Sequence, residues 1–161
     1  MASDDVAWRH AVPEDHAGIA AVVDDWWGGR RMADMLPRLF FDHFRDTSFV
    51  ASAPDGTAVA FVVSFASPHD PATGYVHFIG VHPGWRGRGL GQAAYEHAFA
   101  ALSQRGCHRV VAVTSPANAG SQAFHRALGF DVSETVADYD GPGEDRVVLT
   151  RGLDAPPSAP S

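Results

Sequence analysis

A chain of 161 residues is long enough to bury one hydrophobic core without help from metal ions or disulfide bonds. Hydrophobic residues make up 45% of it and charged residues 19%, a balance typical of a globular domain rather than a largely disordered chain. Nineteen acidic residues against twelve basic ones give a formal charge of −7. This charge argues against a general nucleic-acid binder, so we expect no nucleic-acid partner.

The single cysteine, Cys107, allows no disulfide within the chain, and we therefore expect a cytoplasmic protein. The first residues lack the basic start and apolar run of a signal peptide, and no stretch approaches the roughly 20 apolar residues of a membrane span. We therefore expect no membrane partner. No two histidines have the spacing of a helical zinc site, so we also expect no metal. We expect one domain over residues 1–153 and a disordered tail, rich in Pro, Ser and Ala, over 154–161.

Hydrophobic periodicity and turn residues predict the elements in chain order as β-α-α-β-β-β-α-β-α-β-β. Strands are predicted over 6–12, 49–53, 58–65, 75–81, 110–114, 130–139 and 146–151, and helices over 13–27, 32–44, 90–104 and 118–128. In the helix over 32–44 the residues expected to face inward are Leu36, Leu39, Phe40 and Phe44, and Pro37 is expected to mark a restart in its early part. This order predicts an α/β domain with a mixed sheet.

A glycine-rich turn separates the strand over 75–81 from the helix over 90–104. It reads Val-His-Pro-Gly-Trp-Arg-Gly-Arg-Gly-Leu-Gly over residues 81–91. Glycine lets the backbone approach a ligand closely and adopt positive φ, and the first amides of a helix can donate to an anion. Arg86 and Arg88 add positive charge. The pattern predicts an anion site, and the alternative is an ordinary glycine turn with solvent-exposed arginines.

Three phosphate-binding patterns compete for this turn. A dinucleotide-binding G-x-G-x-x-G that begins at Gly87 would need a third glycine at Gln92, and no acidic residue stands about twenty residues further on. A Walker loop needs lysine, which the chain lacks. The third pattern, R-x-x-G-x-G, is fitted by Arg86, Gly89 and Gly91. This spacing resembles the pyrophosphate loop of the GNAT N-acetyltransferase superfamily.

The resemblance extends beyond the loop. Residues 79–83, Ile-Gly-Val-His-Pro, fit the superfamily's apolar-x-Val-x-Pro strand end. Downstream, Asn118 precedes a Phe-His-x-x-x-Gly-Phe frame over 124–130, with His125 where the superfamily usually has tyrosine. The element order over residues 6–151 also resembles the family. It implies a mixed, mostly antiparallel sheet with splayed central strands and helices on both faces.

The resemblance also implies a co-substrate, acetyl-CoA. Backbone groups of Ile79 and Val81 would pair with the pantetheine arm as an added strand does, and an amide near Ile79 would polarise the acetyl carbonyl. The amides over 86–92 would hold the pyrophosphate, and Asn118 would reach the cofactor arm. The implied cofactor-binding residues are Ile79, Val81, Arg86, Gly87, Arg88, Gly89, Gly91, Gln92 and Asn118.

Two histidines are the candidates for proton transfer, because an amine must lose a proton when it is acetylated. His77 shares a face of its strand with Ile79 and Val81, and arylalkylamine acetyltransferases carry a histidine at the matching position, which the resemblance would make the proton acceptor. The alternative is a histidine with no catalytic role. His125 stands where many members carry the presumed acid for the leaving thiolate, and imidazolium can also donate a proton.

The acceptor pocket of the family is walled by the first two helices and their connection. Here that stretch holds Asp25, Trp26 and Trp27, and aromatic faces with carboxylates suit a cation. The alternative is that the tryptophans complete the core. Tyr139, near the final hairpin, is a second candidate wall residue.

These observations predict an acetyl-CoA-dependent N-acetyltransferase that moves an acetyl group directly to the primary amine of a small molecule. An enzyme for protein or peptide amines is the alternative within this class. A non-catalytic acyl-CoA-binding regulator is the alternative from another class, because the phosphate loop only binds. Dimers are common in the superfamily, so a homodimer is compatible with this prediction.

Overall fold

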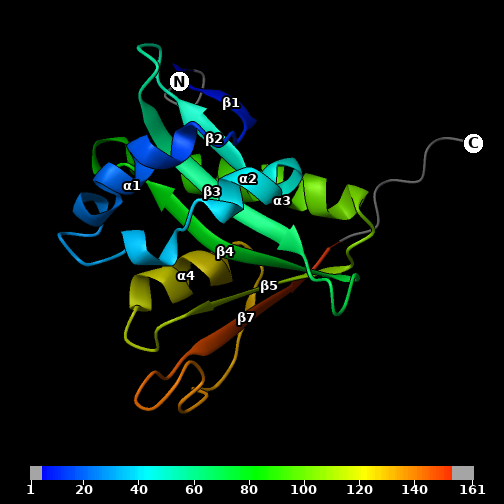
Figure 1. Ribbon diagram of the computed structural model, residues 1–161. Coiled ribbons are helices and arrows are strands. Elements are labelled where there is room, and N and C mark those ends of the chain that lie inside the picture. The colour runs from blue at the N-terminus through cyan, green and yellow to red at the C-terminus, as the bar shows by residue number, and fades with distance from the viewer. Residues whose placement is uncertain (1–4, 154–161) are drawn as a thin grey trace, which may run out of the picture. The chain divides into compact units, whose positions relative to one another are not determined.

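The computed structural model describes residues 5–153, which form two compact units (Figure 1). The first unit holds residues 5–65 and 76–102, and the second holds 66–75 and 103–153. Strand β4 continues from the second unit into the first at residue 76. The tail predicted over 154–161 lies outside the described residues, and the single domain over 1–153 stays a prediction.

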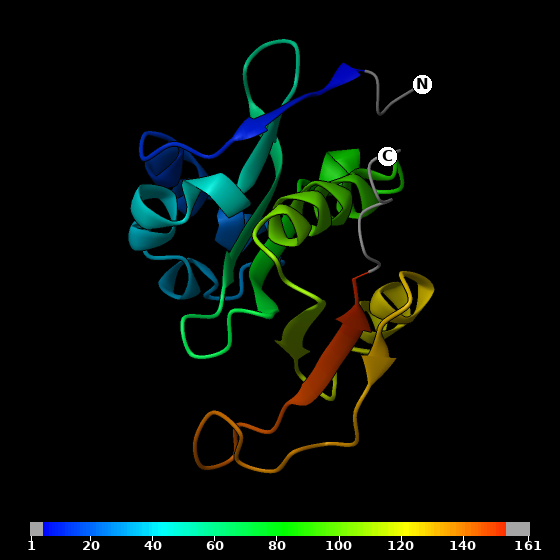
Figure 2. The same ribbon diagram turned by 90° about the vertical axis from the view of Figure 1, so that its right-hand side faces the viewer.

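The first unit combines strands and helices from both of its chain segments. Its strands are β1 (Ala7–His10), β2 (Phe49–Ser52), β3 (Ala58–Ala66) and β4 (Thr73–Val81). The unit includes β3 up to residue 65 and β4 from residue 76. Its helices are α1 (Asp15–Trp26), α2 (Leu39–His43) and α3 (Leu90–Gln104), with the short 3-10 turns η2 (Ala33–Met35), η3 (Arg45–Thr47) and η4 (Pro83–Trp85). Figure 2 shows α1 and α2 on one face of β3 and α3 on the other, as expected from the sequence.

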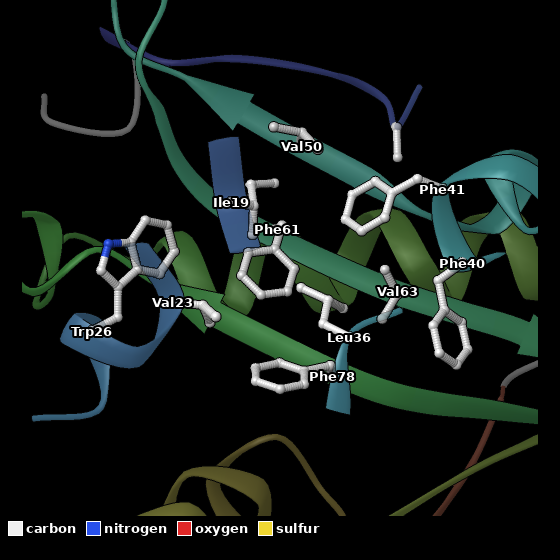
Figure 3. Close-up of a cluster of buried hydrophobic side chains, with 11 residues drawn as sticks. Ile19, Val23, Trp26, Leu36, Phe40, Phe41, Val50, Phe61, Val63 and Phe78 are labelled. Atoms are coloured by element: carbon white, nitrogen blue, oxygen red, sulfur yellow. The ribbon is translucent and has the colours of Figure 1, made fainter. Parts of the chain in front are cut away.

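Apolar spacing explains how α1 covers the strands of this unit. Ile19, Val23 and Trp26 recur at helical spacing and are buried, while Gly28 and Gly29, both with positive φ, follow the end of the helix. Figure 3 shows these three side chains gathered with Phe61 of β3 and Phe78 of β4. The cluster fixes the end of α1 next to the second half of β4.

The second unit is built on a small group of strands and one helix. Its elements are the first residues of β4, then β5 (Arg109–Thr114), α4 (Ala119–Ala127), β6 (Asp131–Val132) and β7 (Val147–Gly152). β5 pairs antiparallel with β7 from Arg109↔Gly152 to Thr114↔Val147, and β6 adds a short antiparallel pairing to β7. β4 pairs parallel with β5 from Thr73↔Arg109 to Tyr75↔Val111.

The seven strands of the described residues follow the order β1-β2-β3-β4-β5-β7-β6. Antiparallel pairing joins β1 to β2 and β2 to β3, so the mixed, mostly antiparallel sheet expected from the sequence is confirmed. No helix within residues 5–153 is both long and apolar enough to cross a bilayer.

Two predicted elements differ from the structure. The helix expected over 32–44 is interrupted, because Pro37 lacks an N–H and restricts Leu36, which adopts φ −127° and ψ 63°. The restart changes the helical phase, so Phe41 is fully buried, whereas Leu39, expected inward, is 46% exposed.

The strand expected over 130–139 shrinks to two residues and one bridge, Val136↔Arg146. The loop between β6 and β7 is held by its own side chains. The carboxylate of Asp145 accepts a hydrogen bond from the amide of Asp138, and that of Asp138 accepts one from the amide of Gly143, both at 2.8 Å. Asp138 adopts a φ of 55°, a conformation that interrupts a strand.

Candidate functional site

The loop between β4 and α3 presents backbone donors at the start of a helix. The first intrahelical bond runs from the amide of Ala93 to the carbonyl of Gly89 at 3.0 Å. The amides of Leu90, Gly91 and Gln92 therefore lie ahead of the helical ladder, where the helix dipole favours an anion. Leu90 itself is buried and anchors the first turn.

Two glycines shape this loop. Gly87 and Gly89 both have a φ of 78°, a conformation that other residues rarely adopt. A Cβ atom built at either position would meet nothing within 4 Å, so there is open space above the backbone at both. Backbone donors, positive φ and open space together fit a phosphate or pyrophosphate group.

The two arginines of the loop contact the protein itself. Arg86 donates from Nη2 to the carbonyl of Trp26 at 2.5 Å and from Nε to the carbonyl of Val81 at 3.2 Å. The guanidinium of Arg88 lies 4.5 Å from the ring centre of Trp85. The Arg86 side chain therefore builds the loop. Its backbone amide donates to the carbonyl of Pro83 at 3.4 Å and closes the turn η4.

Strand β4 leads into this loop with the alternation expected from the sequence. Tyr75, His77, Ile79 and Val81 are half-buried, and the residues between them are buried. At the buried position 80, a Cβ atom would lie 2.7 Å from Cε1 of Phe61 and 3.0 Å from Cη2 of Trp27. Glycine at this position lets the two rings lie directly against the strand.

His77 is fixed by two contacts from the segment that follows α1. Its Nε2 lies 2.5 Å from the carbonyl oxygen of Met35. Its ring stacks on Phe40, with ring centres 4.4 Å apart and planes 13° apart. A carbonyl only accepts hydrogen bonds, so Nε2 carries the proton and the lone pair of neutral His77 is on Nδ1. This nitrogen can accept a proton.

The residues predicted to wall an acceptor pocket occupy different environments. Trp26 is 4% exposed and packs near Phe61, so its side chain belongs to the core, which was the alternative left open by the sequence. Trp27 is half-buried and packs edge-on to Phe78, with ring centres 5.1 Å apart. Asp25 is exposed. Of the two tryptophans, Trp27 is the one with side-chain surface to offer a ligand.

Asn118 and His125 belong to α4 of the second unit. The Oδ1 of Asn118 caps the helix by accepting the amide of Ser121 at 3.0 Å, which leaves its NH2 group as a donor. His125 is 4% exposed, and its Nδ1 lies 2.7 Å from the carbonyl of Ser121. Burial lowers the pKa of His125, although the bond to Ser121 opposes this shift. The burial therefore disfavours the imidazolium that a proton donor needs at neutral pH.

Tyr75, in the second unit, was not among the site residues predicted from the sequence. Burial raises the pKa of Tyr75 to about 12, and the nearby groups of Tyr139 and Asp140 add to the effect. Tyr75 therefore keeps its proton at neutral pH and can donate a hydrogen bond. Tyr139, predicted as a wall residue, is 45% exposed. The only signal for Tyr75 in the sequence was its place in the same alternation as His77.

Comparison with known proteins gives a consistent result. The sequence model of the family described as "Acetyltransferase (GNAT) family" matches residues 15–130. The aminoglycoside N(6′)-acetyltransferase type 1 of Salmonella typhimurium is 31% identical over 135 residues, which cover 73% of this chain and 90% of that protein.

Two further matches cover different shares of their proteins. The mycothiol acetyltransferase of Beutenbergia cavernae is 34% identical over 88 residues, 55% of this chain and 30% of that protein. The chain thus spans about a third of the length of the mycothiol acetyltransferases it matches. The solved diaminobutyrate acetyltransferase of Paenibacillus lautus, in complex with its substrate and coenzyme A, shares the fold with a TM-score of 0.73 and 21% identity, covering 92% of this chain and 95% of that one.

Proposed function

The chain belongs to the acetyltransferase (GNAT) family, and from that premise we propose that it is an acetyl-CoA-dependent N-acetyltransferase acting on the primary amine of a small molecule. The observation that carries the proposal is the loop after β4. Gly87 and Gly89, with positive φ and open space above them, lie directly before the first amides of α3. This arrangement suits the pyrophosphate of a coenzyme A thioester, which supplies the activated acetyl group when bound.

Two groups of residues in the first unit bind different parts of acetyl-CoA. The amides from Gly87 to Gln92, including those of Arg88, Gly89 and Gly91, hold the pyrophosphate, and the side chain of Arg86 supports their loop. Ile79 and Val81 lie on β4 beyond Tyr75, the last residue in its pairing with β5, and their backbone groups pair with the pantetheine arm. The contact of Asn118 with the cofactor arm stays a prediction from the sequence.

His77 takes the proton from the acceptor amine, directly or through a water molecule. Its Nε2–H is held by Met35, and its Nδ1 carries the lone pair that accepts the proton. Stacking on Phe40 keeps the ring from turning. His125 is buried beside Phe130 and is better suited to holding α4 in place than to donating a proton as imidazolium.

The relatives support a small acceptor. Their names describe enzymes that acetylate an aminoglycoside and L-2,4-diaminobutyric acid, both of which are small amines. In this chain, Trp27 and the exposed Asp25 near the end of α1 are the proposed acceptor contacts, and the role of Tyr139 stays a prediction from the sequence. Carboxylate and aromatic surface favours amines with little negative charge.

A thiol-release assay with acetyl-CoA across an amine library tests the proposal, with protein and peptide amines assayed in parallel. His77→Gln and His77→Ala distinguish a role of His77 as the base from a role in contacting Met35, because glutamine can still donate to the carbonyl of Met35 but cannot act as the base. We expect both variants to lower kcat by about 10²-fold or less, since water substitutes in part. Full turnover in both would show that His77 is not the base.

The assay also separates the alternatives. Turnover confined to peptide amines would indicate a protein acetyltransferase, and acetyl-CoA binding without turnover on any amine would indicate a binding regulator. The cytoplasmic location and the homodimer expected from the sequence stay predictions.

A further inference from the structure

Asp24 fixes the segment that orients His77, although the two side chains are not in contact. Its Oδ1 accepts the amides of Met32 and Ala33 at 2.7 and 2.8 Å. Bonds from two backbone amides to one carboxylate are charge-assisted and therefore strong. They attach the start of η2 to the last turn of α1.

The turn held by Asp24 ends at the residue that binds His77. Within η2, the amide of Met35 donates to the carbonyl of Met32 at 3.0 Å, so the position of Met35 follows from that of Met32. The carbonyl of Met35 then accepts the Nε2–H of His77. One continuous set of hydrogen bonds therefore runs from the carboxylate of Asp24 through η2 to the imidazole.

Before Met32 the segment is open, and Met32 and Ala33 are held both by this attachment and by partial packing against the core. Gly28 and Gly29 precede it with positive φ, and residues 28–31 are exposed. Its second half is held independently, since Leu36 is fully buried and its carbonyl lies 2.8 Å from Nε2 of His16. Loss of the Asp24 carboxylate should therefore loosen η2 without unfolding the unit.

We propose that Asp24 is a positioning residue that, through η2, holds His77 as the Nε2–H tautomer with Nδ1 ready to accept a proton. The inference rests on the proposed function, because it takes His77 as the base of the acetyl transfer. An imidazole without a fixed carbonyl partner exchanges between its two tautomers, and the base is then correctly protonated and oriented for only part of the time.

Long-range ¹H–¹⁵N NMR of the histidine rings tests the proposal in the full chain without any substrate. The spectrum of the wild type should show His77 as the Nε2–H tautomer, assigned with His77→Gln. Asp24→Ala should shift both ring nitrogens toward averaged values, whereas Asp24→Asn, whose Oδ1 can still accept the two amides, should keep the wild-type tautomer. Asp34→Ala is the matched control, because Asp34 lies on the same turn, 72% exposed, and pairs with Arg31.

Kinetics supply the second measurement. Asp24→Ala should lower kcat about tenfold with an unchanged KM for acetyl-CoA, Asp24→Asn should restore most of the loss, and Asp34→Ala should match the wild type. An unchanged tautomer in Asp24→Ala, or a changed tautomer with an unchanged kcat, would overturn the proposal. Failure of the proposed function would give a different result from these two outcomes. The wild type would then transfer no acetyl group, while the tautomer of His77 could still be measured.

Discussion

The guanidinium of Arg86 donates to the main-chain carbonyl of Trp26 at 2.5 Å, which joins the loop after β4 to the end of α1. A second bond, from Nε to the carbonyl of Val81, ties the same side chain to the end of the strand. The carbonyl at the end of a helix carries partial negative charge and suits a cation. The arginine of the R-x-x-G-x-G pattern thus holds the geometry of the loop, while the amides of Leu90, Gly91 and Gln92 lie ahead of the first bond of α3.

Replacement of Arg86 by alanine should therefore destabilise the protein even without a ligand. Two bonds from a charged but exposed donor are worth about 1–2 kcal/mol together, and the loosened loop should bind coenzyme A about tenfold more weakly. Thermal denaturation of the ligand-free protein and calorimetry with coenzyme A measure the two effects. Arg88→Ala, which removes only the stacking on Trp85, is the stability control. Weakened binding with an unchanged melting temperature in Arg86→Ala would mean that the guanidinium contacts the ligand instead.

Replacement of Gly89 by valine should weaken coenzyme A binding at least 100-fold, because the side chain would occupy the open space above the loop. Gly56→Val is the matched control, since Gly56 has a similar φ of 89° and open space but lies in the turn between β2 and β3. Both variants carry a similar backbone strain, on the order of 1–3 kcal/mol. Calorimetry on the folded variants compares them, and equal affinities for Gly89→Val and the wild type would refute the loop assignment.

The parts of the fold that follow from local pattern were predictable from the sequence. The bounds of α3 match the prediction because its apolar spacing, its preceding glycines and Gly106 all agree. In the helix over 32–44, Pro37 indicated a restart, but tertiary packing of Leu36 and Phe41 decides which residues face inward. The strand over 130–139 depends on side-chain bonds within a loop, which periodicity does not reveal.

The candidate site also has parts that were predictable from the sequence and parts that were not. The loop was predictable because glycine spacing reports backbone geometry directly. The partners of His77 were not, because Met35 is 42 positions away and contributes a backbone carbonyl rather than a recognisable side chain. Nor could the sequence indicate that Arg86 contacts the carbonyl of Trp26, 60 positions away.

Two glycine-to-alanine variants should shift stability in opposite directions. At Gly80 the added methyl group would overlap the buried ring of Phe61 and press on Trp27, which should cost about 1–3 kcal/mol. At Gly18, within α1, a Cβ atom meets nothing within 4 Å, so the higher helix propensity of alanine should add up to about 1 kcal/mol. Denaturant unfolding of both variants measures the sign of each change in the free energy of unfolding. A Gly80→Ala protein as stable as the wild type would show that the rings can move away freely.

The stability of the protein should depend on the protonation of His125. Because burial lowers its pKa in the folded state, the unfolded chain binds this proton more readily than the folded one does. The contribution of neutral His125 is therefore fully present above the ordinary histidine pKa of about 6.5, and it is lost as the pH falls through the lowered folded value. The free energy of unfolding should rise with pH across this window.

His125→Phe isolates that contribution from the other histidines, because phenylalanine preserves a ring beside Phe124 and Phe130 but cannot titrate. The variant loses the bond to Ser121 and should be less stable at pH 7.5, so the slope with pH is the informative quantity. Urea unfolding between pH 5 and pH 7.5 should give a flatter profile for the variant, by at most about 1.4 kcal/mol per pH unit for one proton. A steeper profile in the variant would mean that folding raises the pKa of His125. In that case His125 would carry the charge that donation to a leaving thiolate at neutral pH requires.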